Sequence, residues 1–204
     1  MTEVEARTWI EERFGEAAAK RLEAYGVLLI EESERQNLIA RSTMDQLWTR
    51  HLLDSAQLVP LGRDAGDGEW IDIGTGAGLP GIVAAILQPR HVVMIEPRRR
   101  RADFLDRVVQ ALELDAEVLC TSAARCQRAP AAIVSARAVA SLDMLLMDAA
   151  SFSDLSTLWL LPKGRSAQSE LADARHAWHG VFHVEPSLTA TDSSIVVARN
   201  VRRR

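Results

Sequence analysis

The sequence predicts an α/β fold in which a seven-stranded, mostly parallel sheet follows an N-terminal helical extension. Three observations support this prediction. Short apolar runs alternate with helical periodicity from residue 69 onward, residues 70–81 pass from an apolar strand into a glycine-dense turn, and no helix separates the last two expected strands. Strands that alternate with helices form a parallel sheet covered on both faces.

The first 55 residues have the periodicity of amphipathic helices. Apolar residues recur at steps of three and four among Glu and Arg, at Val4, Trp9, Ile10 and Phe14 and then at Leu22, Tyr25, Leu28 and Leu29. The pattern breaks over 36–43 and resumes over 44–55, and the Gly- and Asp-rich segment 62–68 marks the change to strand periodicity. We therefore expect a helical extension, 1–61, packed on an α/β domain, 62–204, as one structural unit.

The α/β domain contains seven predicted strands and four predicted helices. The strands are expected at 69–73, 92–96, 116–120, 131–136, 157–161, 182–185 and 194–199, and the helices at 80–87, 99–112, 142–153 and 166–178. Only a short link near 186–192 joins the last two strands, so they are expected to pair as an antiparallel edge.

The composition indicates a globular protein, with 204 residues, 48% hydrophobic and 25% charged residues. No apolar run reaches 18 residues and the N-terminus has no apolar signal core, so we expect a cytoplasmic protein that does not enter membranes. Cys120 and Cys126 have no His or further Cys at ligand spacing, and His176 and His179 have no evident third ligand. No metal site is predicted, and nothing demands more than a monomer.

The glycine turn and a downstream acid predict a nucleoside site. Residues 70–78 read Trp-Ile-Asp-Ile-Gly-Thr-Gly-Ala-Gly, and Glu96 ends the next predicted strand. Glycines let a backbone turn sharply against a ligand, and an acid at the tip of the second strand can accept hydrogen bonds from both ribose hydroxyls.

The spacing favours S-adenosylmethionine over a dinucleotide. Leu79 stands where a dinucleotide motif has its third glycine, and the neighbouring Pro80 has no N–H to offer a phosphate. The expected fold is therefore that of a class I S-adenosylmethionine-dependent methyltransferase, which is Rossmann-like. The alternatives are a dinucleotide site, or a glycine turn that only packs a helix on the sheet.

Two basic clusters stand out in a chain of net charge −4, namely the run Arg98–Arg101 and the terminal run Arg202–Arg204. The first follows the carboxyl end of a predicted cofactor-binding strand, the rim where substrates approach an open α/β sheet. Arginine binds phosphate and stacks on bases, so this run favours an RNA partner, although a solvated face is the simpler alternative.

The chain resembles the RsmG (GidB) family of bacterial 16S rRNA methyltransferases over nearly its whole length. The matching segments are Asn37-Leu38, Arg50-His-Leu-Leu-Asp-Ser55, Asp72-Ile-Gly-Thr-Gly-Ala-Gly-Leu-Pro-Gly81, Ser135-Ala-Arg-Ala-Val139 and Lys163-Gly164 followed by Glu170. The resemblance implies methylation of guanine N7 in 16S rRNA, in the 530-loop region near the decoding site. It also implies cofactor contacts at Gly74, Leu79, the backbone of Ala123 and Ala124, and Arg137.

The chain departs from the family pattern at two places. Leu79 stands where members usually have Phe, which keeps an apolar wall but loses stacking. Ser122-Ala123-Ala124 replaces the usual Arg-Ala-Glu, so any role of those two charged side chains is absent and only backbone contacts carry over.

The candidate site residues follow from the residue patterns and from the family resemblance. Guanine N7 carries a lone pair and no proton, so its methylation needs positioning and no general base. The catalytic residue stays unknown, with Arg137, Lys163 and His51 as positioning candidates. The expected cofactor-binding residues are Asp72, Gly74, Gly76, Gly78, Leu79, Glu96, Ala123, Ala124 and Arg137, and the RNA-binding candidates are Arg50, Arg98, Arg99, Arg100 and Lys163.

Several alternatives stay open at the level of sequence. A methyltransferase of a small molecule or a protein, or a non-catalytic RNA-binding module, would keep the same fold. The expected partner is 16S rRNA or the small ribosomal subunit, and the sequence does not distinguish naked rRNA, an assembly intermediate and the mature subunit as the substrate.

Overall fold

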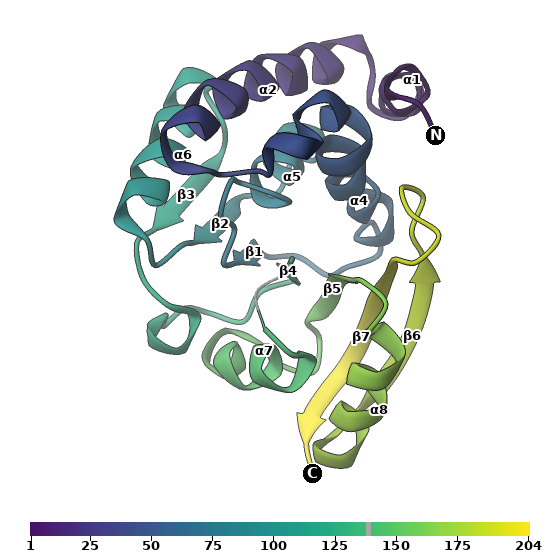
Figure 1. Ribbon diagram of the computed structural model, residues 1–204. Helices are drawn as coiled ribbons and strands as arrows, with labels where there is room; N and C mark the ends of the chain where they lie inside the picture. Colours follow the sequence, from purple (N-terminus) through teal and green to yellow (C-terminus); the bar gives the residue numbers. More distant parts are fainter. Residues whose placement is uncertain (138–139) are drawn as a thin grey trace.

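The computed structural model describes residues 1–137 and 140–204. Its strands form one seven-stranded sheet in the order β3-β2-β1-β4-β5-β7-β6 (Figure 1). The first five strands pair in parallel and β7 runs antiparallel to both of its neighbours. The strands are β1 Trp70–Ile73, β2 Val92–Ile95, β3 Ala116–Leu119, β4 Ile133–Ala136, β5 Leu158–Lys163, β6 Trp178–Pro186 and β7 Ser194–Arg203. The predicted sheet and its antiparallel edge are confirmed.

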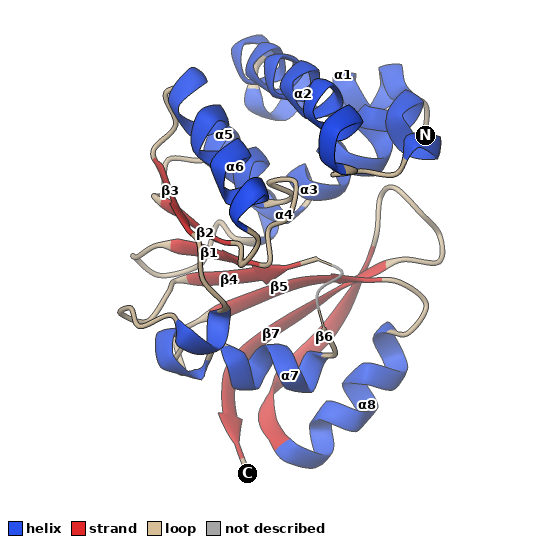
Figure 2. Ribbon diagram, turned by 60° about the vertical axis from the view of Figure 1, so that its left-hand side comes forward, coloured by secondary structure: helices blue, strands red, loops and turns tan. Residues whose placement is uncertain are grey.

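Helices cover both faces of the sheet, as Figure 2 shows. One layer contains α5 (Gly81–Leu87) and α6 (Arg99–Ala111), with the N-terminal helices packed outside them. The other layer contains α7 (Leu142–Asp148) and α8 (Ala167–Ala177). Each layer buries its own apolar cluster against the sheet, and the cluster on the first face joins Ile10 and Leu22 of the extension to Trp70 and Ile82 of the α/β part. The extension therefore shares its core with the sheet.

The N-terminal extension begins with α1 (Glu3–Phe14) and α2 (Glu16–Gln36). Thr2 and Glu5 form a capping box that satisfies the first free N–H groups of α1. The predicted apolar stripe is wrong at Val4, which is mostly exposed, because the face that packs inward is the one with Ala6 and Ile10. No helix of the described residues is long and apolar enough to cross a membrane.

The segment predicted as one helix over 44–55 consists of shorter pieces. A 3₁₀ helix, η1 (Arg41–Gln46), is followed by a π-helix, η2 (Trp48–Leu53), and then by α3 (Asp54–Ala56) and α4 (Leu58–Leu61). Leu52 and Leu53 of this segment are both buried. Asp54, the first residue after this π turn, forms an ion pair with Arg137 at the end of β4.

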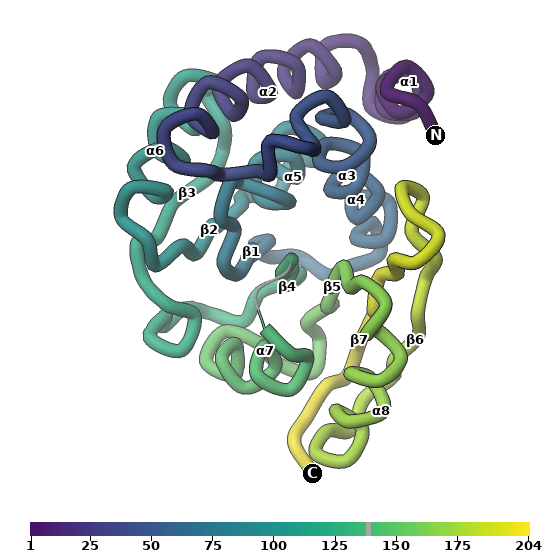
Figure 3. The backbone as a smooth tube through the Cα atoms, in the orientation of Figure 1, coloured from purple at the N-terminus to yellow at the C-terminus, as the bar shows by residue number. Residues whose placement is uncertain are grey.

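The C-terminal half differs from the prediction at several element boundaries. The helix predicted over 142–153 ends at Asp148 and continues only as the 3₁₀ turn η4 (Ala150–Phe152). Trp178 begins β6 instead of ending α8, because its ring is buried against the sheet and its Nε1 donates to Asp143 Oδ1 at 2.6 Å. Strands β6 and β7 are longer than predicted and form a hairpin whose turn reaches the N-terminal extension (Figure 3).

Candidate functional site

The glycine turn after β1 has a backbone that ordinary residues avoid. Gly74, Gly76 and Gly78 all have positive φ, at 61°, 60° and 96°. Only glycine adopts such angles without steric cost. A Cβ on Gly78 would meet Ile82 at 2.5 Å and Leu105 at 2.9 Å, whereas the nearest atom to a Cβ on Gly76 is Arg101 Nη1 at 3.5 Å. Position 78 therefore has no room for a side chain, whereas position 76 borders open space beside the turn.

Asp72 stabilises this turn from the buried side, through hydrogen bonds. It is fully buried in β1, where its Oδ2 accepts from the Gly81 amide at 2.9 Å and its Oδ1 from Ser135 Oγ at 2.7 Å. Trp70 Nε1 donates to the same Ser135 oxygen. Burial raises the pKa of Asp72 to about 6, against the opposing effect of the hydrogen bonds from Ser135 and Gly81. Asp72 thus shapes the turn and does not reach the adjacent hollow.

Glu96 connects the turn to the strand beside it. Its Oε2 accepts from the Gly76 amide at 3.0 Å and its Oε1 from the Arg98 amide at 2.8 Å. The residue is only 3% exposed, so the carboxylate is fixed in one orientation. Each oxygen keeps a lone pair that can accept a further hydrogen bond, which is the role predicted for it toward a ribose.

A hollow of about 440 Å³ opens between the glycine turn, Glu96 and the loop after β3. Its lining includes the apolar side chains of Leu38, Ile73, Leu79 and Ile95, together with Glu96 and Arg137. The missing Cβ of Gly76 faces this space. Asp148, Arg98 and Arg101 also line the hollow. An apolar slot edged by carboxylates and guanidiniums fits a nucleoside that carries an amino-acid tail, so the residues present suit S-adenosylmethionine.

Most predicted cofactor-binding residues lie around this hollow. Gly74, Gly76, Leu79, Glu96, Ala123 and Arg137 line it. Asp72, Gly78 and Ala124 do not, since Asp72 and Gly78 are behind the turn and Ala124 is exposed on the turn η3 (Ala123–Arg125). No ligand contact tests these assignments, which stay predictions.

Tyr25 is a supporting residue that the sequence reasoning missed. It is fully buried on α2, and its hydroxyl donates to the Ala77 carbonyl at 2.7 Å. The N-terminal extension therefore braces the glycine turn directly. A lone tyrosine on an apolar helix face predicts a core position, and only the fold reveals which carbonyl its hydroxyl meets.

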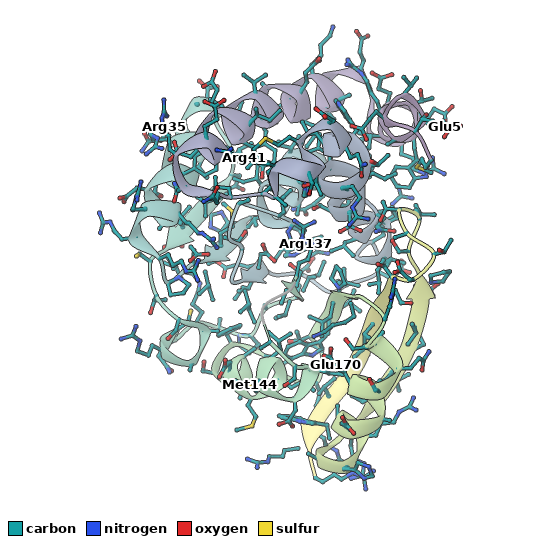
Figure 4. The ribbon with its side chains drawn as sticks, in the orientation of Figure 1. Glu5, Arg35, Arg41, Arg137, Met144 and Glu170 are labelled. Atoms are coloured by element: carbon teal, nitrogen blue, oxygen red, sulfur yellow. The ribbon has the colours of Figure 1, made fainter. Side chains whose placement is uncertain are left out.

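Arg137 follows β4 and joins the site to the extension. Its Nη1 donates to Asp54 Oδ2 at 3.1 Å, and both side chains are about one-fifth exposed. Figure 4 shows Arg137 near the centre of this face, between the N-terminal helices and the α7–α8 layer. The Ser135-Ala-Arg-Ala-Val139 match extends to residues 138 and 139, which lie outside the described residues.

His51 lies in the π-helix before Asp54 and is buried. Its Nε2 lies 2.9 Å from Thr43 Oγ1, and its Nδ1 has no hydrogen-bond partner among the described residues. Burial, together with the positive charge of Arg137, lowers the pKa of His51 to about 4. The imidazole is therefore neutral near pH 7, and its place beside the Arg137–Asp54 pair suits positioning.

Lys163 is not the surface lysine that its position before a glycine suggests. Its side chain is only 8% exposed, and its Nζ contacts Glu170 Oε2 at 2.8 Å and the Ala140 carbonyl at 2.7 Å. Together with Asp54, Arg137 and Glu170 it lines a second hollow of about 290 Å³. An RNA phosphate on the outer surface could not reach it, so Lys163 can act only on a group that enters this hollow.

The arginine run has members in different surroundings. Arg98 and Arg101 line the first hollow, three residues apart at the start of α6. Arg99 is exposed and paired with Asp103 at 2.7 Å, and Arg100 is exposed. Arg101 was missed as a pocket residue, although helical spacing from Arg98 places it on the same face. Arg50 is also exposed, on the π-helix.

No group of three or more His, Cys, Asp or Glu side chains among residues 1–137 and 140–204 is arranged to hold a metal ion. Cys120 and Cys126 are free thiols.

The family profile and the sequence relatives that match this chain carry the same description. Residues 18–195 match the profile of the GidB family, described as rRNA small subunit methyltransferase G. The "Ribosomal RNA small subunit methyltransferase G" of Novosphingobium aromaticivorans is 47% identical over 204 residues, covering 98% of this chain and 89% of its own. The protein of the same description from Rhizorhabdus wittichii is 45% identical, covering 100% and 95%.

A comparison with solved structures shows the same fold at low identity. A mutant of MtNAS in complex with S-adenosylmethionine superposes with a TM-score of 0.59 and 16% identity, over 90% of this chain and 76% of that chain. This likeness concerns the fold, which is that of class I S-adenosylmethionine-dependent methyltransferases.

Proposed function

This chain belongs to the family of rRNA small subunit methyltransferase G, and we propose that it methylates N7 of a guanine in 16S rRNA. It is an S-adenosylmethionine-dependent methyltransferase. The single structural observation that best supports the proposal is the Gly76–Glu96 contact. It fixes a carboxylate at the edge of an apolar hollow, at the carboxyl ends of β1 and β2 where a nucleoside binds in this fold.

The proposed reaction needs no proton transfer by the protein. When bound, S-adenosylmethionine supplies a methyl group activated by a positively charged sulfur. The N7 lone pair forms the new bond to the methyl carbon, the carbon–sulfur bond breaks, and its electron pair stays on sulfur. The positive charge moves to the purine, so the task of the protein is to align the two reactants.

The residues around the hollow have distinct proposed roles. Glu96 accepts from the ribose hydroxyls, Leu79 covers the adenine, and Gly74 and Gly76 let the backbone approach the ligand. Arg137 binds the carboxylate of the amino-acid tail or positions the RNA. Leu79 covers adenine without the ring stacking that a Phe would add, and Ser122 and Ala124 contribute no charge where the family usually has one.

The proposed substrate region is the 530 loop near the decoding site, presented by 16S rRNA or the small subunit. Unpaired loop bases can leave their stack and enter a protein site, unlike bases in an A-form helix. Exposed Arg50, Arg98, Arg99 and Arg100 are the proposed phosphate contacts. Because ribosomal RNA is the proposed substrate, we propose that the protein acts in the bacterial cytoplasm, as a monomer.

Transfer of labelled methyl to purified small subunits and to naked 16S rRNA tests the proposal. We expect label in RNA, at a guanosine where borohydride reduction and aniline treatment cleave the RNA backbone. Label in protein or small molecules alone would contradict an rRNA substrate, and the absence of S-adenosylmethionine binding by calorimetry would exclude methyl transfer altogether.

A further inference from the structure

The second hollow lies beside the proposed cofactor site, and among residues 1–137 and 140–204 Arg137 alone lines both. The first hollow spans the ends of β1 and β2, whereas the second lies at the ends of β4 and β5, which carry Arg137 and Lys163. The strand order reverses between β1 and β4. Ligands of open α/β sheets bind at such a reversal, so reactants in the two hollows would meet at Arg137.

The second hollow has both polar and apolar walls. Pro162 and Ile195, cross-strand partners on β5 and β7, give it an apolar floor. The turn between β6 and β7 closes its far side, because Thr189 Oγ1 donates to Asp54 Oδ1 at 2.8 Å and the Leu188 amide to Gln57 Oε1 at 2.8 Å. This wall is therefore fixed before any ligand arrives.

Unused hydrogen-bonding groups face this space from two sides. Toward the residues that the structure describes, Lys163 uses two of its three N–H donors, on Ala140 and Glu170, and one remains. Asp54 Oδ2 accepts from Arg137, and Glu170 Oε1 accepts from Ser166 Oγ at 2.7 Å. Each of those oxygens keeps capacity for a further donor. The hollow therefore offers cationic donors beside carboxylate acceptors.

We infer that the second hollow binds the target guanine base, an inference that rests on the proposed function. Guanine carries an acceptor at O6 and donors at N1 and N2, which complement these groups. Because O6 and N7 share one edge, an O6 that accepts from the Lys163 and Arg137 side turns N7 toward the cofactor hollow. Adenine carries an amino group in place of O6 and would set a donor against those cations.

The charges of the hollow also suit the product. Methylation at N7 leaves a positive charge on the purine, and the carboxylates of Asp54 and Glu170 line this hollow together with the two cations. Such fixed charges stabilise a cation as it develops. No residue of this hollow needs to remove a proton.

Two glycines provide a matched test. Gly164 lines the second hollow, and a Cβ built on it meets no atom within 4 Å. Gly66 is equally free of contacts but lies in the 62–68 connection, outside both hollows. We expect Gly164→Leu to lower kcat/KM for small ribosomal subunits about 100-fold, because a blocked base cannot reach the methyl group. Gly66→Leu should stay within twofold of wild type.

Calorimetry with S-adenosylmethionine separates a blocked base from a damaged protein. We expect both variants to bind it with wild-type affinity, and Ser194→Leu, which enters the hollow from β7, to repeat the loss of activity. A fully active Gly164→Leu enzyme, or one that has lost S-adenosylmethionine binding as well, would overturn this inference alone. A wild-type enzyme that labels no rRNA would overturn the proposed function and this inference with it.

Discussion

Asp54 and Arg137 pair across the boundary between the N-terminal extension and the sheet, with 3.1 Å between Oδ2 and Nη1. They are 83 residues apart in the sequence. Asp54 directly follows the π-helix η2, and Arg137 directly follows β4. The pair stands between the two hollows, so it fixes the guanidinium that both share.

Asp54→Asn should weaken this anchor while keeping the size of the side chain. We expect a loss of about 1 to 2 kcal/mol of unfolding free energy, since the ion pair becomes a hydrogen bond from the guanidinium to a neutral amide. Methyl transfer to rRNA should fall about tenfold through misplacement of Arg137. Urea unfolding and steady-state kinetics measure the two effects. Asp45→Asn, an exposed acid in the same segment, is the control, and equal behaviour of the two variants would contradict the anchoring role.

Glu96→Gln tests the ribose contact. The amide has one acceptor oxygen where the carboxylate has two, so it cannot accept from Gly76, Arg98 and two hydroxyls together. We expect S-adenosylmethionine to bind at least about tenfold more weakly, as charged hydrogen bonds of this kind contribute more than 1.4 kcal/mol. Titration calorimetry gives the dissociation constant. The exposed Glu34→Gln variant should bind normally, and unchanged binding by Glu96→Gln would remove Glu96 from the site.

Gly76→Ala should impair cofactor binding, whereas Gly78→Ala should impair the stability of the fold. At Gly76 the new methyl group faces the hollow, so we expect loss of cofactor binding with a cost of about 1 kcal/mol for the left-handed backbone. At Gly78 it collides with Ile82 and Leu105, so stability should fall by about 3 kcal/mol. Thermal unfolding and calorimetry on both variants check this. Intact cofactor binding by Gly76→Ala would mean that the hollow is not the cofactor site.

The stability of the fold should depend on pH through His51. Its pKa is about 4 in the folded protein and near 6.5 when unfolded, so the unfolded state takes up the proton first as pH falls. The contribution of the neutral His51 imidazole to the free energy of unfolding is complete above pH 6.5 and is lost as pH drops toward 4. Between pH 7.5 and 5 we expect wild type to lose about 2 kcal/mol more than His51→Gln. Parallel pH dependence of the two proteins in urea unfolding would show that His51 titrates normally.

Arg100→Ala should weaken binding of rRNA without affecting S-adenosylmethionine. Arg100 is exposed at the rim, and each lost phosphate contact lowers the slope of log K against log salt by roughly 0.7 to 0.9. Filter binding over a salt series measures this slope. Arg63→Ala, an exposed arginine beyond the opposite, amino end of β1, is the matched control. A slope that changes equally in both variants would point to nonspecific charge effects.

The site was predictable where local chemistry fixes it. The glycines at 74, 76 and 78 require a backbone that few other residues adopt, and Glu96 ends the neighbouring strand, so their meeting follows from strand order alone. The burial of Lys163 and the contact of Tyr25 with Ala77 were not predictable. Both depend on how layers far apart in the sequence pack together.

The sequence by itself determined the α/β class, the antiparallel edge and the glycine turn after β1, because periodicity and backbone preference act over a few residues. Tertiary structure decided which charges meet. A π-helix that periodicity reads as an ordinary helix brings Asp54 to Arg137, and α8 brings Glu170 to Lys163. Long-range pairs of this kind form only when packed layers bring distant side chains together, so no local pattern encodes them.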